Sequence, residues 1–315
     1  MNFIGADLGG TKSLLRLFTA GGETIREERY EAANHENFDS ILGHFLEDSP
    51  PVSAGCFAIA GPVLGKSAEV TNLSWTIDAC EITRSHGIAT VRLVNDFYGI
   101  AASLVSLGAD DLHVLQEGEL DPSSPRAVLG AGTGLGEALV TGNGGDWMII
   151  ATEGGHADFA PSNQLQDDLL LHLREIYGHV SWERVVSGPG IVTIYRFLKR
   201  REGADAVLVA DASRVAELAD QGDETAVAAM DLFIDCYGAE AGNLALKSLC
   251  RGGLYLAGGI AARNIARMTD GRFLEALTAK GRFGELMKTI PVYLITNPKA
   301  GLIGACSLAR SLARD

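Results

Sequence analysis

Short apolar segments and longer amphipathic segments alternate along most of the chain. In the first hundred residues, apolar runs typical of strands are separated by glycine turns, whereas residues 37–48 and those after Asp78 have the spacing of amphipathic helices. Strands that alternate with helices predict an α/β architecture with a partly parallel sheet. The strands predicted in this region cover residues 2–7, 12–19, 24–31, 52–61 and 89–94.

A second strand, loop and strand unit follows a loop of Pro, Ser and charged residues at 116–126. The segments GADLGGTK (5–12) and GAGTGLGE (130–137) occupy the same place in the two units, and this weak duplication predicts two similarly built halves. The pattern predicts strands at 127–132, 137–142 and 253–260, a turn at 143–146, and helices at 164–177, 211–221, 224–249 and 300–314.

The composition limits the classes of function. A chain of 315 residues can bury a core large enough for two domains, and its formal net charge of -14 argues against a nucleic-acid partner. Five scattered cysteines without a Cys-x-x-Cys pair are typical of reduced thiols. The N-terminus lacks the features of a signal peptide, and no segment approaches the ~18 apolar residues of a membrane span. We therefore expect a soluble, cytoplasmic protein with no membrane partner.

Glycine-rich loops end three of the apolar strands, near residues 9, 132 and 258. One such loop can be a simple tight turn, but three favour sites where backbone N–H groups approach a phosphate chain closely. The order Thr11-Lys12 excludes a Walker A motif, and Leu135 occupies the position where a dinucleotide fingerprint requires glycine. The remaining interpretation is a phosphate cradle built from β-hairpin loops.

Polar residues beside these loops suggest further roles. The hydroxyls of Thr11 and Thr133 can donate to phosphate oxygens. Asp7 would repel a phosphate unless a metal ion lay between them, so we infer that Asp7 orients Mg²⁺, through a water molecule of the ion; the alternative is that it caps the turn. Asn95 and Asp96 end an apolar strand, where α/β sheets bind ligands. From the residues alone, Asp96 could accept the proton of an attacking hydroxyl or cap the helix that follows.

Six segments in this order resemble the bacterial glucokinase family, within the hexokinase, Hsp70 and actin superfamily. They are GADLGGTK, NDF, GAGTGLG, EGGHADFAP, ERVVSGPG and LAGGI, with TNLSW and IPVYLI in addition. The resemblance implies a duplicated ribonuclease-H-like (actin-like ATPase) α/β fold, with two domains around a cleft. We expect a small domain of residues 1–108 plus 297–315, a large domain of residues 109–296, and a homodimer.

The same resemblance implies an ATP-dependent glucokinase that transfers the γ-phosphoryl of ATP to the 6-hydroxyl of D-glucose, with ATP and Mg²⁺ as cofactors. Asp96 is then the catalytic base, and the sugar is bound by Asn95, Asp96, Glu153, His156 and Glu183. Directional hydrogen bonds from these groups suit a ligand with hydroxyls on all sides. The nucleotide is bound by Asp7, Gly9, Gly10, Thr11, Gly132, Thr133, Gly134, Gly258 and Gly259, with the last pair admitting the adenosine.

Two questions stay open in the sequence. The residues that read hydroxyls would also suit another hexose or an amino sugar, and a catalytically idle sugar sensor could share the scaffold. Lys12 departs from the asparagine usual in this group, and we favour a solvent-facing strand residue over an extra phosphate contact. Gly61 stands where the resemblance predicts a cysteine or a similar small residue.

Overall fold

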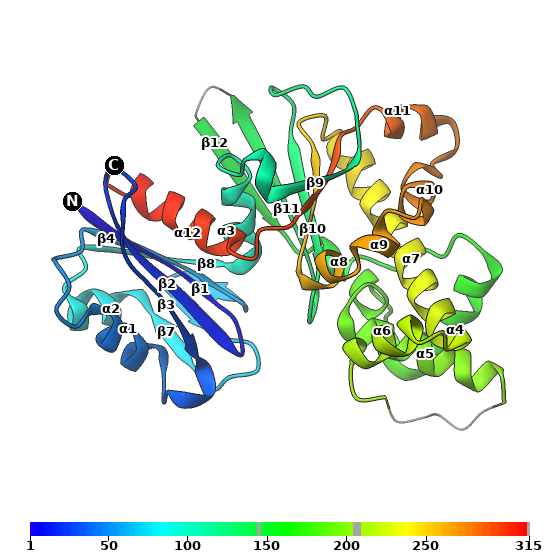
Figure 1. Cartoon of the computed structure of the whole chain (residues 1–315), viewed down its shortest axis with the longest axis horizontal. Helices are drawn as coiled ribbons and strands as arrows, with labels where there is room; N and C mark the ends of the chain where they lie inside the picture. Colours follow the sequence, from blue (N-terminus) through cyan, green and yellow to red (C-terminus); the bar gives the residue numbers. More distant parts are fainter. Residues whose placement is uncertain (144–145, 204–208, 314–315) are drawn as a thin grey trace. The chain divides into compact units, whose positions relative to one another are not determined.

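The computed structural model divides the chain into two compact units (Figure 1). Unit 1 comprises residues 1–111 and 297–315, and unit 2 comprises residues 112–296. The structure describes the chain except for residues 144–145, 204–208 and 314–315. The centre of the turn expected at 143–146 therefore lies outside the described residues.

Unit 1 is built on a five-stranded sheet with the order β3-β2-β1-β4-β8. Strands β1, β2 and β3 form an antiparallel meander, while β1, β4 and β8 run parallel, so that their carboxyl ends share one edge. The strands are β1 (Asn2–Leu8), β2 (Lys12–Thr19), β3 (Thr24–Glu31), β4 (Ala54–Ile59) and β8 (Thr90–Asn95). The parallel edge carries the polar residues predicted for a site.

Helices cover both faces of this sheet (Figure 1). One face packs an apolar cluster against α1 (Phe38–Leu46) and α2 (Ala79–His86), and the other packs against α3 (Asp96–Ser103) and α12 (Ala300–Ser311). Helices α3 and α12 meet at two glycines, since a Cβ on Gly304 would come within 1.7 Å of the carbonyl oxygen of Gly99. The last helix of the chain thus completes the core of the first unit.

A small antiparallel sheet extends from the end of β4. It consists of β5 (Val63–Leu64), β6 (Ser67–Glu69) and β7 (Thr76–Asp78), in that order. Gly61 at its entrance has no room for a side chain, because a Cβ there would lie 2.0 Å from the carbonyl oxygen of Glu69. The expectation of a cysteine or similar small residue at this position is therefore wrong for this fold.

Unit 2 repeats the plan of unit 1. Its sheet has the order β12-β11-β10-β13-β14-β9, with β10 antiparallel to β11 and parallel to β13, as β1 is to β2 and β4. The strands are β9 (Leu112–Gln116), β10 (Arg126–Ala131), β11 (Leu135–Asn143), β12 (Asp146–Thr152), β13 (Leu254–Ala257) and β14 (Val292–Ile295). The two hairpin loops begin at Gly9 and Gly132, so the alignment of 5–12 with 130–137 is displaced by two residues.

The core of unit 2 is a single large apolar cluster centred on α7, which is surrounded by side chains along most of its length. Tyr237 on this helix is fully buried, and its hydroxyl lies 3.4 Å from the carbonyl oxygen of Leu129. The helices are α4 (Gln164–Tyr177), α5 (Gly188–Arg201), α6 (Ala212–Asp220), α7 (Glu224–Ser248), α8 (Gly259–Arg263), α9 (Ile265–Met268), α10 (Arg272–Thr278) and α11 (Gly284–Lys288).

The elements predicted from periodicity are present in the described residues, although several ends differ. The segment 253–260 is a strand only as far as Ala257, because the backbone turns at Gly258 into α8. Helix α5 and the short strands β9, β12 and β14 were not predicted. The strands β9 and β14 have only five and four residues, too few positions for a period to be recognised.

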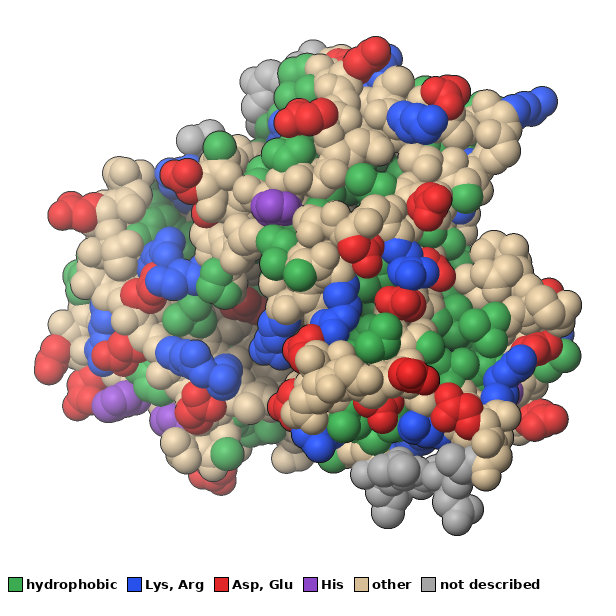
Figure 2. Space-filling view, turned by 45° about the vertical axis from the view of Figure 1, so that its right-hand side comes forward, with side chains coloured by type: hydrophobic (Ala, Val, Ile, Leu, Met, Phe, Trp, Pro, Cys, Tyr) green, Lys and Arg blue, Asp and Glu red, His purple; other side chains and the backbone are tan. Residues whose placement is uncertain are grey.

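The surface matches the composition. On the face drawn in Figure 2, acidic side chains are dispersed among basic ones, without a basic patch. The described part of the chain holds no helix that is long and apolar enough to cross a membrane. All five cysteines are free, and only Cys80 is exposed.

Candidate active site

The parallel edge of unit 1 brings the first group of predicted residues together. Asp7 lies near the end of β1, and Asn95 and Asp96 lie at the junction of β8 and α3. The hairpin from β1 to β2 closes through a hydrogen bond from the amide of Gly9 to the carbonyl of Lys12, 2.9 Å long. Thr11 is exposed at its tip, and Lys12 is an exposed residue at the start of β2, as favoured above.

The carboxylate of Asp7 is in an unusual electrostatic environment. Burial, and secondarily the negative charge of Asp96, raise the pKa of Asp7 from 3.8 to about 6. The carboxylate lies against the first turn of α12, where a Cβ on Gly301 would come within 2.6 Å of its Oδ2. Asp7 and Asp96 are thus two acidic groups close enough to disfavour each other's charge.

The structure separates the roles of the two residues at the start of α3. Asn95 is the N-cap: its Oδ1 accepts a hydrogen bond from the amide of Phe97 at 2.9 Å, and its Nδ2 donates to the carbonyl of Gly61 at 3.2 Å. Asp96 is the first helical residue, and its Oδ1 also lies 2.9 Å from the amide of Phe97. Because Asn95 occupies the cap position, the alternative that Asp96 is the cap residue is wrong.

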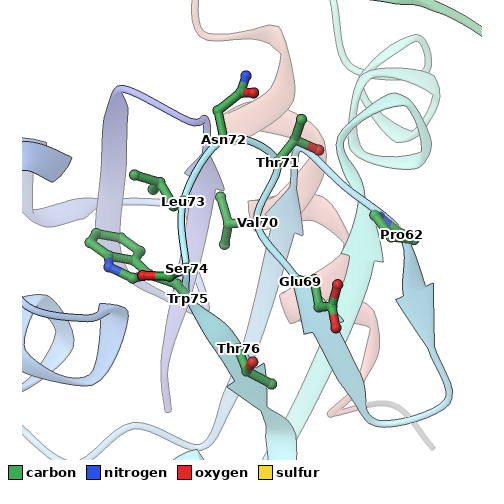
Figure 3. Close-up of a pocket in the computed structure, with 9 residues that line it drawn as sticks. All are labelled: Pro62, Glu69, Val70, Thr71, Asn72, Leu73, Ser74, Trp75 and Thr76. Carbon is green, nitrogen blue, oxygen red and sulfur yellow. The ribbon is translucent and has the colours of Figure 1, made fainter.

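A hollow of about 440 Å³ lies beside this edge, in the loop between β6 and β7 (Figure 3). Thr71 and Asn72 form the tip of the loop in that view. The amide of Thr71 donates to the carbonyl of Ala60 at 2.8 Å, and a Cβ on Gly10 would lie 2.6 Å from the carbonyl oxygen of Thr71. The first glycine loop therefore rests on the segment TNLSW.

The second glycine loop is tied to the start of α5. The amide of Gly188 donates to the carbonyl of Gly132 at 2.8 Å, and Ser187 caps the helix by accepting a hydrogen bond from the amide of Gly190 at 3.1 Å. Thr133 is exposed at the tip of the loop, as Thr11 is in unit 1. The motif SGPG thereby supports the second glycine loop from a distance of more than fifty residues in the sequence.

Glu153, His156 and Glu183 form one group in unit 2. His156 Nε2 lies 3.9 Å from a carboxylate oxygen of Glu153, and His156 Nδ1 lies 4.0 Å from one of Glu183. Glu153 and His156 are exposed, whereas Glu183 is half-buried. Oε2 of Glu183 accepts a hydrogen bond from the amide of Leu135 at 3.0 Å, and a Cβ on Gly134 would lie 2.5 Å from it. Glu183 therefore lies directly beside the end of the second glycine loop.

Backbone pairing brings these distant residues together. The amide of Trp182 donates to the carbonyl of Ala157, and the amide of Phe159 donates to the carbonyl of Val180, both at 3.0 Å. The rings of Phe159 and Trp182 pack edge to face at 4.9 Å, and both side chains are buried. Together, the two backbone hydrogen bonds and the ring contact fix the loop at 153–156 next to Glu183.

A second hollow, of about 230 Å³, lies beside the glycine pair 258–259. Gly258 has a φ of 89°, and a Cβ there would come within 2.4 Å of the carbonyl oxygen of Ala131, so only glycine fits. Apolar side chains from four helices, α5 to α8, form part of the wall, which could not be predicted from the sequence because its residues are scattered along the chain. The lining residues are Ile191, Ala212, Ser213, Ala216, Glu217, Asp220, Met230, Ile260, Arg263 and Asn264.

Among the described residues, no group of three or more His, Cys, Asp or Glu side chains could hold a metal ion. A site made of two carboxylates and substrate phosphates would need no such group, since Mg²⁺ is commonly bound in this way. Asp7 and Asp96 are the acidic pair in unit 1 with the chemistry to take part in it.

Comparison with known proteins assigns a family to these features. The glucokinase family model matches residues 4–312. The glucokinase of Nostoc punctiforme is 40% identical over 337 aligned positions, which cover 98% of this chain and 99% of that protein. The crystal structure of a glucokinase from an Antarctic psychrotroph is 31% identical, with a TM-score of 0.87 and coverage of 98% and 99%. A ROK family glucokinase from Streptomyces griseus, solved with glucose and AMPPNP, shares the fold at 21% identity, with a TM-score of 0.65 and coverage of 99% and 100%.

Proposed function

Because the chain belongs to the glucokinase family, it is a sugar kinase of the actin-like ATPase fold, and we propose that it transfers the γ-phosphoryl of ATP to the 6-hydroxyl of D-glucose. One observation carries the proposal: the carboxylate of Glu183 is hydrogen-bonded to the residue that follows the phosphate loop 132–134. The Glu183 carboxylate, which can hydrogen-bond to sugar hydroxyls, therefore adjoins the loop 132–134, which is suited to binding phosphate.

The sugar is bound by the group formed by Glu153, His156 and Glu183, together with Asn95 and Asp96 of unit 1. In unit 2 the two carboxylates flank an imidazole that can donate or accept, which suits a ring of hydroxyls. The half-buried Glu183 is held by a backbone amide, so it keeps a fixed direction toward its ligand.

The nucleotide is bound by the glycine loops. Backbone N–H groups and threonine hydroxyls at Gly9, Gly10 and Thr11, and at Gly132, Thr133 and Gly134, contact the phosphates. The hollow beside Gly258 and Gly259 accepts the adenosine, because its walls include Ile191, Met230 and Ile260 and a purine is flat and largely apolar. The presence of AMPPNP in the structure of the Streptomyces griseus protein supports ATP as the donor.

Asp96 is the catalytic base, and Asp7 is the residue that would hold Mg²⁺. The residues present fit the ion, because burial and a second carboxylate hold the pKa of Asp7 at about 6 and a nearby cation would stabilise its charged form. The ion, when bound, neutralises charge on the phosphates. Asp96 accepts the proton of the attacking hydroxyl, while Asn95 caps α3 and so leaves Asp96 at the first helical position.

A coupled assay with Mg·ATP tests the proposal on glucose, mannose, fructose and N-acetylglucosamine at equal concentration. We expect dominant turnover on glucose, and loss of about a hundredfold or more in kcat for Asp96→Asn with ATP binding nearly unchanged. A folded Asp96→Asn protein with normal turnover would refute the assignment of the base. Turnover dominated by another sugar would refute glucose as the substrate.

The family also implies a homodimer and a cytoplasmic location, which we include in the proposal. Sedimentation at several protein concentrations tests the first, since a dimer that dissociates changes its sedimentation coefficient with dilution.

A further inference from the structure

Two carboxyl groups are buried side by side under the sugar-binding loop of unit 2. Glu137 on β11 is 3% exposed and Glu240 on α7 is 0% exposed, and the two carboxyl groups lie close enough for the charge of Glu240 to raise the pKa of Glu137. They are the buried acids of the described residues, and the functional proposal assigns a role to neither. A carboxylate can only accept a hydrogen bond, so two carboxyl groups can be hydrogen-bonded to each other only when they share a proton.

The surroundings decide which of the two carries the proton. Glu240 faces cationic and donor groups: Nδ2 of Asn243 donates to its Oε2 at 2.8 Å, and Nζ of Lys247 lies 3.7 Å from its Oε1. Lys280 donates to Oδ1 of Asn243 at 2.7 Å and adds positive charge nearby. Oε1 of Glu137 and Oε1 of Glu240 are both buried without a hydrogen-bond partner among the described residues, but only the Glu240 oxygen has a lysine beside it. Burial and the charge of Glu240 raise the pKa of Glu137 to about 7, so Glu137 is the neutral partner.

The neutral carboxyl group of Glu137 packs directly against Gly154. A Cβ on Gly154 would come within 2.0 Å of Oε2 of Glu137 and within 2.7 Å of its Cδ. The main chain adds to this contact, because Oγ1 of Thr152 donates to the carbonyl of Glu137 at 3.0 Å and the amide of Gly154 donates to Oγ1 of Thr152 at 3.3 Å. Gly154 lies between Glu153 and His156, so a movement of the Glu137 side chain that displaces Gly154 also displaces these two residues.

We propose that Glu137, by sharing a proton with Glu240, is a positioning residue. Its carboxyl group supports Gly154 and so holds Glu153 and His156 in the geometry for sugar binding. This inference rests on the proposed sugar site. When Glu137 loses the shared proton, two buried carboxylates repel each other at contact distance, and the side chain under Gly154 must move. The affinity for the sugar then falls with rising pH. The titratable groups that face this pair are Lys247, Lys280 and Tyr237.

The test compares the wild type with Glu137→Gln. Glutamine has the shape of a protonated glutamate, remains neutral and can still donate a hydrogen bond to Glu240. It should therefore preserve the contact with Gly154 at every pH. We expect the wild-type KM for glucose to rise about tenfold between about pH 6 and about pH 9, and that of Glu137→Gln to lack this rise. Identical pH profiles of KM in the two proteins would overturn the inference.

A second variant separates positioning from packing. Glu137→Ala should raise the KM for glucose about tenfold or more while the KM for ATP changes less than about twofold, since small displacements of binding groups have large effects. The control is Thr225→Ala, which removes a buried, hydrogen-bonded side chain at the other end of α7. It should lower the free energy of unfolding without changing either KM. Equal effects of Glu137→Ala on both KM values would refute a role at the sugar loop.

The outcomes distinguish this inference from the proposed function. A wild type that phosphorylates none of the sugars in the coupled assay refutes the function itself. An active wild type whose pH profile matches that of Glu137→Gln refutes only the role of Glu137. If Glu137→Ala does not fold, the comparison with Glu137→Gln still decides.

Discussion

Gly301 in α12 is the position where a single methyl group should reveal how Asp7 is held. In Gly301→Ala the new Cβ would lie 2.6 Å from Oδ2 and 2.8 Å from Cγ of Asp7. Ordinary contact begins near 3.4 Å, so the methyl group is too close by about 0.8 Å. Asp7 cannot yield easily through its main chain, because β1 is hydrogen-bonded to strands on both sides.

The expected loss of stability follows from two opposing contributions. Overpacking of a buried site costs about 1–3 kcal/mol, and alanine in a helix gains up to about 1 kcal/mol over glycine. We therefore expect Gly301→Ala to lower the free energy of unfolding by about 1–2 kcal/mol. If the Asp7 side chain rotates away instead, less stability is lost, but kcat with Mg·ATP falls because the carboxylate has left its position.

Gly43→Ala is the matched control in the same unit. Gly43 is an exposed residue of α1, where a Cβ would meet nothing closer than 3.6 Å, so the variant should be more stable by up to about 1 kcal/mol. Equilibrium unfolding in urea, followed in the transition of unit 1, and steady-state kinetics compare the two variants. A Gly301→Ala protein as stable as Gly43→Ala, with normal kcat, would show that Asp7 does not lie against α12.

Three further predictions concern unit 2. Glu153→Gln should raise the KM for the sugar more than the KM for ATP, measured by steady-state kinetics; an unchanged KM for the sugar would count against its place in the site. Ala216→Phe should fill the hollow beside Gly259 and weaken ATP binding by about tenfold or more without affecting sugar binding, measured by calorimetry, and unaltered ATP affinity would remove the adenosine from that hollow. Native Glu137 keeps a proton that the unfolded chain loses, so between pH 4.5 and about 7 the free energy of unfolding should fall with rising pH. The fall should reach at most about 3 kcal/mol and level off above that range. Urea unfolding of Glu137→Gln should lack this decline, and an equal decline in both proteins would refute the assignment of the proton.

Much of the fold could be predicted because its signals are local. The strands β1, β2 and β10 and the helices α4 and α7 follow from apolar periodicity within a few turns of chain. The glycines predicted the two hairpin loops, because only residues without a side chain let the backbone closely approach a ligand or another segment. The duplication was also visible, although its register was displaced by two residues.

The candidate site was predictable in its residues but not in its arrangement. Glu153, His156 and Glu183 were selected by resemblance, yet their grouping depends on the backbone pairing of 157–159 with 180–182. From the residues alone, Asp96 could be the base or the cap of α3, because aspartate is a favoured cap residue. Only the hydrogen bonds of Asn95 to Phe97 and to Gly61 decided it.

By itself the sequence determined the α/β class, the glycine loops and the family of the sugar kinase, because these depend on neighbouring residues or on motifs in a fixed order. The tertiary structure decided which surroundings each charge receives. Glu137 and Glu240 are more than a hundred positions apart, and Asp7 meets Gly301 across almost the whole chain. The pKa of a carboxyl group depends on burial and on nearby charge, and both are set by segments that only folding brings together.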